Sequence, residues 1–503
     1  MNRAARLLSG IMALAVLFLA ANVSAQSDQP PYLYYFSPDL NAYVIERADG
    51  SQSRLIGQGL AAPDTNQAGG SWSPSGKYFA WKTSIWAGPG NVEPQAWIVS
   101  ADGTERLTML DNLRDVDQME WSPIEDLLFV VDTHVNGAAG ATYYLINVET
   151  RALITSFTLF NWQGGFYYSA FRWSPDGSHV VLFYDVTNQV NGEWPIRRFR
   201  RAVSRTGEID DAPIGRTFGS IYHISPRFSA SGDLAYLSAD GEQLVVENIA
   251  SKTTQTYDMP DVRYFYEIHW SAAGNYALLS SPGSCEPGTP CADLWLLTGT
   301  GLIQIAEQID YQEYYPPELW APTGDLAQFV TVDGVLHLLN PATLEIVPVS
   351  GIENVGGAAW SADGRRLLVV LAETDAPIYL YNIETETSTP LDAVQLYGSI
   401  EQIVSSPDSR YFAVGRSFAI LNVRERRFSV LRTHEEAMIG YYSWHPSSEW
   451  LICNQMLYRA GGGIGPLFSS VGRSDGSQQR DLSLGFYHAA WLPENVIPHL
   501  SAE

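Results

Sequence analysis

The stretch that decides the fold is Trp173-Ser174-Pro175-Asp176-Gly177, which is followed by the apolar run Val180 to Tyr184. Similar phrases recur along the chain at intervals of 39 to 55 residues. Their first residues are Trp72, Trp121, Trp173, Phe228, Trp270, Trp320, Trp360, Ser405, Trp444 and, in partial form, Trp491. A phrase that recurs at such a period is typical of a repeat protein with one supersecondary unit per repeat.

Each repeat reads as four short strands joined by tight turns. In the first repeat, Pro74 fixes φ and Gly76 supplies a left-handed position, which together predict a turn. An Asp-Gly pair at Asp102 and Gly103 predicts a second turn of the hairpin kind. The predicted strands are Ser71–Ser73, Tyr78–Lys82, Ala96–Ser100 and Glu105–Thr108.

The composition favours an all-β protein. Hydrophobic residues make up 46%, aromatic residues 12% and charged residues 17% of the 503 residues, with 42 Gly and 28 Pro. This is rich in strand and turn formers. Four antiparallel strands per repeat, repeated about ten times, predict a β-propeller in which each blade packs on its neighbours.

Both ends of the chain contribute to the predicted ring. The segment Phe486–Pro493 reads as a lone first strand, whereas Tyr32–Ser37, Ala42–Arg47 and Ser53–Ile56 read as strands two to four of a blade. Joining them would remove an exposed sheet edge. This favours a single ring of ten blades, while two smaller tandem propellers fit the same number of strands.

The repeat resembles the WD40-like (PD40) repeat of TolB-type periplasmic propellers and, more distantly, the propellers that gate oligopeptidases. The matching residues are 72–76, 173–177, 270–274 and 360–364, and the resemblance covers about residues 32–495. It implies a propeller fold, and propellers of this kind serve as scaffolds, lids or catalytic surfaces. The separate α/β domain of TolB does not precede these repeats, so TolB's partners are not implied.

The N-terminus reads as an export signal. Arg3 and Arg6 precede the apolar run Leu7–Ala21, and Val23 to Ala25 form a small-residue cleavage site. We therefore expect a secreted or periplasmic protein with no stable membrane span after cleavage; an uncleaved anchor is the alternative. The expected organisation is a signal peptide at 1–25, a linker at 26–31, a β-propeller at 32–495 and a C-terminal tail at 496–503.

Charge and cysteine content exclude some functions. The formal net charge is −25, and such a field repels phosphate backbones, so nucleic-acid binding is disfavoured. Cys285 and Cys291 lie in a segment rich in Gly and Pro and predict a small disulfide loop in an oxidising compartment. Cys453 lies in an apolar run and is expected to be a buried free thiol.

No short metal-binding pattern is present, so we expect neither a metal nor another cofactor. The nine histidines are scattered without a metal-ligand spacing. A propeller can still gather distant histidines at its axis. They are His134, His179, His223, His269, His337, His434, His445, His488 and His499.

Two segments suggest chemistry but have simpler interpretations. Gly472 to Gly476 matches the G-x-S-x-G pattern of hydrolases, yet it aligns with the turns between strands three and four, and we interpret it as a turn. Arg197, Arg198, Arg200 and Arg201 form a basic cluster that could bind an anionic sugar or an acidic partner. Solvated arginines on a strand are the favoured interpretation.

Aromatic residues and long loops are predicted to share one face. The long loops between strands two and three are Ser84–Gln95, Thr133–Ala141, Asp185–Pro195, Ser281–Ala292 and Asn454–Pro466. The aromatic residues precede the repeat phrases, where each blade crosses to the next at the mouth of the central channel. The predicted ligand-binding residues are Phe166, Tyr167, Tyr168, Tyr222, Tyr264, Tyr266, Tyr314, Tyr315, Tyr441, Tyr442 and Tyr487.

These patterns favour a non-enzymatic propeller that binds a protein, peptide or glycan. Tyrosine-rich surfaces offer contact area at low entropic cost and stack on sugars or peptide groups. Glu267, Glu313 and Glu318 add a preference for cationic or hydroxyl-rich ligands. An alternative interpretation of the same tyrosines is core packing between blades. The alternative function is an extracytoplasmic carbohydrate-active or peptide-hydrolysing enzyme with its site at the channel mouth, and a structural envelope protein is a third possibility.

Overall fold

The computed structural model describes residues 29–60, 62–63, 70–83, 96–113, 115–133, 140–160, 171–187, 196–216, 227–238, 243–259, 267–283, 291–310, 319–372, 377–391, 403–414, 419–430, 437–459, 463–485 and 488–500. Within these ranges the chain forms ten small antiparallel sheets. None of the described helices is long and apolar enough to cross a membrane.

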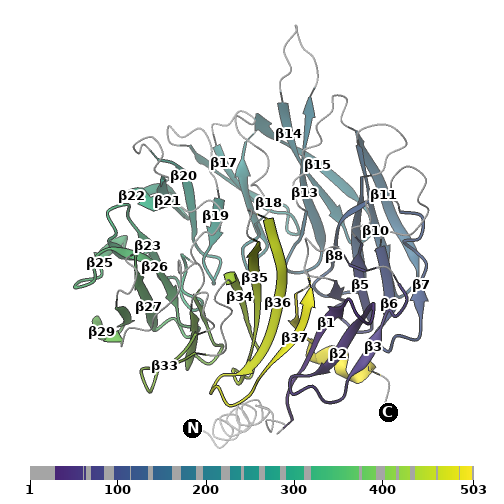
Figure 1. Ribbon diagram of the computed structural model, residues 1–503. Coiled ribbons are helices and arrows are strands. Elements are labelled where there is room, and N and C mark those ends of the chain that lie inside the picture. The colour runs from purple at the N-terminus through teal and green to yellow at the C-terminus, as the bar shows by residue number, and fades with distance from the viewer. Residues whose placement is uncertain are drawn as a thin grey trace, which may run out of the picture.

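The ten sheets are the blades of a single propeller, numbered here from the N-terminus (Figure 1). The strands of the first five blades are β38 (Ala490–Trp491), β1 (Tyr32–Ser37), β2 (Ala42–Arg47) and β3 (Arg54–Ile56) in blade 1; β4 (Ser71–Trp72), β5 (Tyr78–Lys82), β6 (Ala96–Ser100) and β7 (Arg106–Leu107) in blade 2; β8 (Val116–Trp121), β9 (Leu127–Asp132), β10 (Gly140–Asn147) and β11 (Ala152–Phe160) in blade 3; β12 (Arg172–Trp173), β13 (His179–Thr187), β14 (Ile196–Ser204) and β15 (Ile209–Arg216) in blade 4; and β16 (Asp233–Leu237), β17 (Gln243–Asn248) and β18 (Thr253–Asp258) in blade 5.

The remaining strands continue the same meander around the ring. They are β19 (Glu267–Trp270), β20 (Ala277–Pro282), β21 (Cys291–Thr298) and β22 (Gly301–Asp310) in blade 6; β23 (Ala327–Val330), β24 (Leu336–Asn340) and β25 (Glu345–Pro348) in blade 7; β26 (Val355–Trp360), β27 (Arg366–Leu371), β28 (Ile378–Asn382) and β29 (Thr387–Leu391) in blade 8; β30 (Ile403–Ser405), β31 (Tyr411–Val414), β32 (Ala419–Asn422) and β33 (Arg427–Val430) in blade 9; and β34 (Ala437–Trp444), β35 (Trp450–Arg459), β36 (Gly463–Arg473) and β37 (Gln479–Gly485) in blade 10.

Two blades depart from the predicted four strands. In blades 5 and 7 the first strand is reduced to one isolated bridge, Phe228 with Leu234 and Trp320 with Ala327 respectively. The repeat phrase still occupies the position of strand one in both blades. The prediction of an all-β, ten-bladed propeller with mostly four-stranded blades is therefore confirmed.

Ten hydrophobic clusters close the ring, because each of them joins two neighbouring blades. The first contains Tyr43 of blade 1 together with Phe79 of blade 2, and another contains Val471 of blade 10 together with Val44 of blade 1. The other eight join the intermediate pairs in order. An unbroken circuit of cores excludes two tandem propellers and confirms the single ring.

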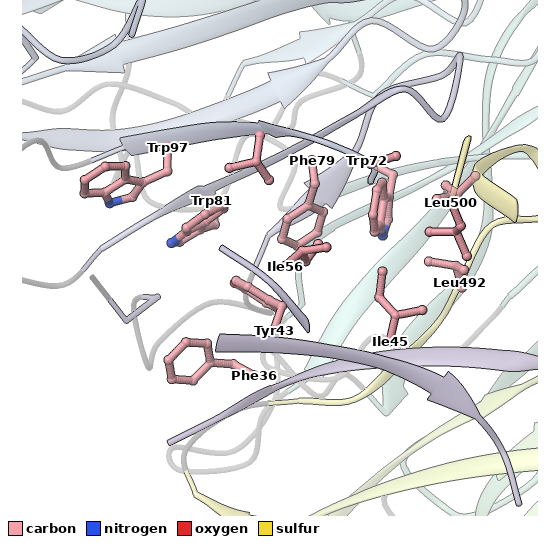
Figure 2. Packing of buried hydrophobic residues seen from close by; sticks show 13 residues of the cluster. Phe36, Tyr43, Ile45, Ile56, Trp72, Phe79, Trp81, Trp97, Leu492 and Leu500 are labelled. Carbon is pink, nitrogen blue, oxygen red and sulfur yellow. The ribbon is translucent and has the colours of Figure 1, made fainter. Parts of the chain in front are cut away.

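The cluster between blades 1 and 2 is unusually rich in aromatic rings. Figure 2 shows Trp97, Trp81, Phe79 and Trp72 in a row that faces the side chains of blade 1. The Tyr43 ring lies edge-on to Phe79, with 4.7 Å between the ring centroids. Such rings contribute to stability both by apolar burial and by their relative orientation.

The chain ends meet in blade 1, as the sequence predicts. Leu33 and Tyr34 pair with Trp491 and Ala490, so β38 supplies the first strand of a blade whose other strands come from the N-terminus. The short helix η2 (Glu494–His499) follows β38 and ends close to blade 2. Its first turn packs on Gly76, where an added Cβ would lie 2.3 Å from the backbone oxygen of Asn495.

The tryptophans of the repeat phrase connect successive blades by hydrogen bonds. In seven blades the indole Nε1 donates to a carbonyl of the preceding blade, and the acceptor is the residue just before that blade's own anchor residue. For example, Trp173 Nε1 donates to Glu120 O at 3.2 Å. The seven donors are Trp121, Trp173, Trp270, Trp320, Trp360, Trp444 and Trp491.

The junction between blades 1 and 2 lacks this bond. Trp72 Nε1 is buried and has no hydrogen-bond partner among the described residues. The anchors Phe228 and Ser405 have no indole to donate. The repeat phrase therefore encodes a contact between blades as well as a turn within a blade.

Replacement of Trp173 by Phe is expected to lower stability more than replacement of Trp72 by Phe. Both changes remove similar apolar bulk, but only Trp173 loses a hydrogen bond, which contributes about 1 kcal/mol. The two urea unfolding midpoints give the difference directly. Equal shifts of the two midpoints would contradict a stabilising role for the indole bond.

Candidate functional site

The meander divides the molecule into two faces. The turns between strands one and two and between strands three and four lie on one face, which we call the turn face. The connections between strands two and three and from blade to blade lie on the opposite face, which we call the loop face. This follows because successive strands run in opposite directions.

The turn face is formed by short, internally bonded turns. In blade 4, Ser174 Oγ donates to Asp176 Oδ1 at 2.6 Å, and the amide of His179 donates to Ser174 Oγ at 3.0 Å. Burial raises the pKa of Asp176, but hydrogen bonds from Ser174 and Ser178 outweigh it and hold the pKa below its usual value. Gly177 completes the turn with a φ of 64°. The Ser-Pro-Asp-Gly phrase thus fixes this turn.

The hydrolase-like segment belongs to the turn face. Gly472 and Arg473 end β36, and Ser474 to Gly476 form the turn into β37. The Ser474 amide donates to Glu449 O at 2.9 Å, and the Ser477 amide donates to Asp475 Oδ1 at 2.8 Å. The interpretation of this motif as a turn is confirmed.

The loop face carries the longer connections, but some are shorter than predicted. The expected loop Asn454–Pro466 is wrong, because β35 continues to Arg459 and β36 begins at Gly463. Asn454 and Gln455 fall inside the predicted loop, yet both residues are buried. Likewise β13 continues to Thr187, inside the predicted loop Asp185–Pro195.

Asn454 can be buried in a strand because its amide group is fully used. Its Nδ2 donates to Ala489 O at 3.1 Å, and its Oδ1 accepts from the Ala489 amide at 2.9 Å and from Ser469 Oγ at 2.5 Å. These bonds connect β35 to β36 and to the residue before β38. Burying a polar side chain whose hydrogen bonds are all made in this way costs little folding free energy.

The predicted signal peptide lies outside the described residues. So do nine of the eleven predicted ligand-binding residues, namely Phe166, Tyr167, Tyr168, Tyr222, Tyr264, Tyr266, Tyr314, Tyr315 and Tyr487. Cys285 lies outside them too, so the Cys285–Cys291 disulfide stays a prediction. Cys453 is a buried free thiol, as predicted, and burial raises its pKa.

Tyr441 and Tyr442 are the described members of the set, and they have different surroundings. Tyr442 is 8% exposed and belongs to the core between blades 9 and 10. Tyr441 is partly exposed, and its ring lies edge-on to His488 with 5.8 Å between the centroids. Burial lowers the pKa of His488, which favours a neutral ring beside Tyr441.

Within the basic cluster, Arg200 is buried and Arg201 is partly buried, and both are paired with carboxylates rather than solvated, which corrects the favoured interpretation for these two residues. Arg200 is 2% exposed, and its guanidinium lies 2.8 Å from Asp210 and 2.7 Å from Glu247 of the next blade. Arg201 lies 2.6 Å from Asp211. This arrangement cannot be predicted from the sequence, because the partner carboxylates lie on other strands, β15 and β17. Arg200 therefore links blade 4 to blade 5, whereas Arg201 pairs with Asp211 within blade 4.

Charged groups also lie on the innermost strands β8, β12 and β19. The Arg172 guanidinium of blade 4 lies 3.3 Å from the Glu120 carboxylate of blade 3. Burial raises the pKa of Glu120, although Arg172 opposes that shift. In blade 6, His269 Nε2 lies 2.9 Å from Glu267 Oε2. The described residues contain no group of three or more His, Cys, Asp or Glu that could hold a metal.

Comparison with known proteins identifies similar folds. No protein-family model matches the sequence, and no curated protein matches it. Two solved structures of oligogalacturonate lyase are similar: a manganese complex (TM-score 0.35, 14% identity, 76% of this chain and 100% of that chain) and the enzyme from Vibrio parahaemolyticus (0.33, 11%, 68% and 95%). The tricorn protease is similar at a TM-score of 0.29 and 11% identity over 88% of this chain and 49% of that chain. The finer resemblance to the TolB-type repeat stays a prediction.

Proposed function

We propose that this chain is an exported, non-enzymatic β-propeller that binds a protein, peptide or glycan on its loop face. The observation that carries the proposal is the difference between the two faces. On the turn face one compact turn chemistry recurs, as in Ser174 to Gly177 and Ser361 to Gly364. On the loop face the connections differ in length from blade to blade. Binding residues are usually found on connections that a rigid scaffold positions.

The residue types of the loop face suit non-covalent recognition. Tyr441 presents a partly exposed ring at the inner strand of blade 10. The sequence predicts further tyrosines at other blade crossings, and we expect them to extend the same chemistry around the channel mouth. Tyr rings combine apolar area with a hydroxyl group, so they can contact both the faces and the polar groups of a ligand.

Simultaneous replacement of Tyr167, Tyr266 and Tyr315 by Ala is expected to abolish ligand capture. Loss of three aromatic contacts removes the groups that would dominate the binding energy, since a few such residues usually carry most of it. The measurement is a pull-down from the native secretome and from a peptide and glycan library. Circular dichroism should show an unchanged fold.

The matched control removes exposed apolar side chains from the turn face. Ile124, Leu344 and Ile497 are 52%, 45% and 41% exposed, and all three lie near that face. Their replacement by Ala should leave capture unchanged. Retained capture by the tyrosine variant, or equal loss in the control, would place the binding surface elsewhere.

A further inference from the structure

The outer edge of blade 7 exposes an apolar surface. β25 is the last strand of this blade and pairs with β24 alone among the described strands, and Figure 1 shows it at the outer rim of the ring. Leu344, Ile346 and Val347 are 45%, 36% and 43% exposed. No other outer strand in the described part of the chain has two exposed large apolar residues. We call Leu344 to Val347 the blade 7 edge.

The backbone of the blade 7 edge has outward-facing hydrogen-bonding groups. The Val349 amide donates to Leu336 O at 2.8 Å, so the backbone groups of Val349 face β24. In an antiparallel ladder this direction alternates from residue to residue, so the N–H and C=O of Ile346 point away from β24. Pro348 has no N–H, which limits any added ladder to the residues before it. An added strand can therefore pair with β25 at Ile346.

The two exposed apolar side chains of β25 lie on opposite faces of the blade. Ile346 is the ladder partner of Leu339, which belongs to the core between blades 6 and 7. Val347 is the ladder partner of Leu338, which packs against the core between blades 7 and 8. Each side chain thus extends a hydrophobic core to the surface. A strand added beside β25 would cover both, because its successive side chains point to opposite faces.

Blade 5 shows the usual chemistry of such an edge. Like blade 7 it has three regular strands, and its outer strand is β18. The ladder registers place Thr254 and Gln255 of β18 at the positions that Ile346 and Val347 occupy in β25. Thr254 and Gln255 are also exposed, but they are polar. Polar side chains on an outer strand discourage pairing with other chains. The apolar pair in blade 7 lacks this protection, which favours a docking role.

The surroundings of the blade 7 edge are acidic. Residues 264–364 contain twelve Asp and Glu residues and no Lys or Arg. The exposed Glu345 begins β25, and the exposed Glu307 lies on the outer strand of blade 6. Glu384 and Glu386 are exposed in the turn before β29 of blade 8. No ion pair within the described residues involves any of these four carboxylates. Such an uncompensated field attracts cationic groups.

We propose that the blade 7 edge binds an extended segment of a partner protein in which apolar residues are flanked by Lys or Arg. The segment adds a strand to β25, and its backbone exchanges hydrogen bonds with the N–H and C=O of Ile346. Its apolar side chains cover Ile346 and Val347, while its cationic side chains face Glu345 and the carboxylates of the neighbouring blades. A second copy of this chain is the poorer occupant, because two copies with a net charge of −25 repel each other. The site lies on the outer rim and is independent of the loop-face binding proposed above.

Calorimetric titration of the full chain with synthetic peptides tests this proposal. The probe is acetyl-Lys-Lys-Val-Ile-Val-Lys-Lys-amide, which should bind saturably and more weakly as the salt concentration rises. Peptides with Glu in place of Lys, or with Ser in place of Val and Ile, should not bind. The same probe with N-methylated Val and Ile cannot donate backbone hydrogen bonds, so it should bind at least about tenfold more weakly. Equal affinity of the N-methylated probe would contradict strand addition.

Two matched double variants locate the binding site. Ile346→Lys with Val347→Lys removes the apolar contacts and adds positive charge, so it should weaken binding of the probe by roughly 30-fold or more. Thr254→Lys with Gln255→Lys adds the same charges at the equivalent positions of blade 5, and it should change the affinity by less than about threefold. Both variants should melt as the unaltered chain does, because the replaced side chains are exposed.

Three results would overturn the inference. The first is failure of the probe to bind the unaltered chain. The second is an equal effect of the two double variants, which would place the peptide at another surface such as the loop face. The third comes from sedimentation of the unaltered chain without peptide: a dimer that Ile346→Lys with Val347→Lys dissociates would show that a second copy occupies the edge.

Discussion

Removal of residues 490–503 is expected to open the ring and abolish cooperative unfolding. The truncation deletes β38, so the inner edge of blade 1 loses the partner of Leu33 and Tyr34. It also removes Leu492, Val496 and Leu500 from the core between blades 1 and 2. Each buried apolar side chain contributes roughly 1.5–3 kcal/mol, and the sum approaches the whole stability of an ordinary domain.

Thermal unfolding followed by circular dichroism measures this effect. A chain that ends at Leu500 is the control and should melt as the full chain does, because it keeps every described residue. A synthetic peptide of residues 486–503, added to the truncated protein, should restore part of the melting midpoint, since closure is non-covalent. An unchanged midpoint in the truncated protein would show that β38 is dispensable.

Replacement of Arg200 by Met is expected to lower stability by about 3–5 kcal/mol. Arg200 bridges Asp210 in its own blade and Glu247 in blade 5, and Tyr236 Oη donates to the other oxygen of Glu247 at 2.6 Å. Removing the guanidinium leaves the poorly exposed Glu247 carboxylate without its counter-charge. Removing one partner of a buried ion pair lowers the free energy of unfolding by about this amount, because the other charge stays buried without a partner.

Two further variants decide how the network acts. The double variant Arg200→Met with Glu247→Leu should recover most of the loss, because no uncompensated buried charge remains. Arg205→Met removes an ion pair whose side chains are 51% and 44% exposed, and it should cost about 0–1 kcal/mol. Denaturant midpoints give all three values. Equal effects of Arg200→Met and Arg205→Met would contradict the role assigned to burial.

Local chemistry explains why the propeller could be predicted from the sequence. The turn at Ser174 to Gly177 is closed by bonds among neighbouring residues, so its sequence suffices to specify it. The pairing of the two termini can be predicted because the N-terminal blade lacks a first strand and the C-terminal segment supplies one. This argument favours a single ring, and the circuit of ten hydrophobic cores confirms it.

Long-range partners explain what the sequence could not predict. From the sequence alone Asn454 is interpreted as a loop residue, because its hydrogen bonds to Ala489 and Ser469 depend on the fold. Arg200 is likewise interpreted as a solvated charge, because its partner Glu247 lies in another blade. In blade 6, Glu267 reads from the sequence only as an acidic neighbour of the tyrosines. Its relation to Ser280 depends on strand register, which no spacing in the sequence displays.

Closure by β38 also sets the order in which the chain can fold. Leu33 and Trp491 are partners in one ladder although almost the whole chain separates them. Contacts between such distant segments have a high entropic cost early in folding. Blades 2 to 10 can therefore form from local hairpins before blade 1 is complete. Until the last residues arrive, the inner edge of β1 has no strand to pair with. The growing chain therefore passes through a stage in which that edge is open to wrong partners.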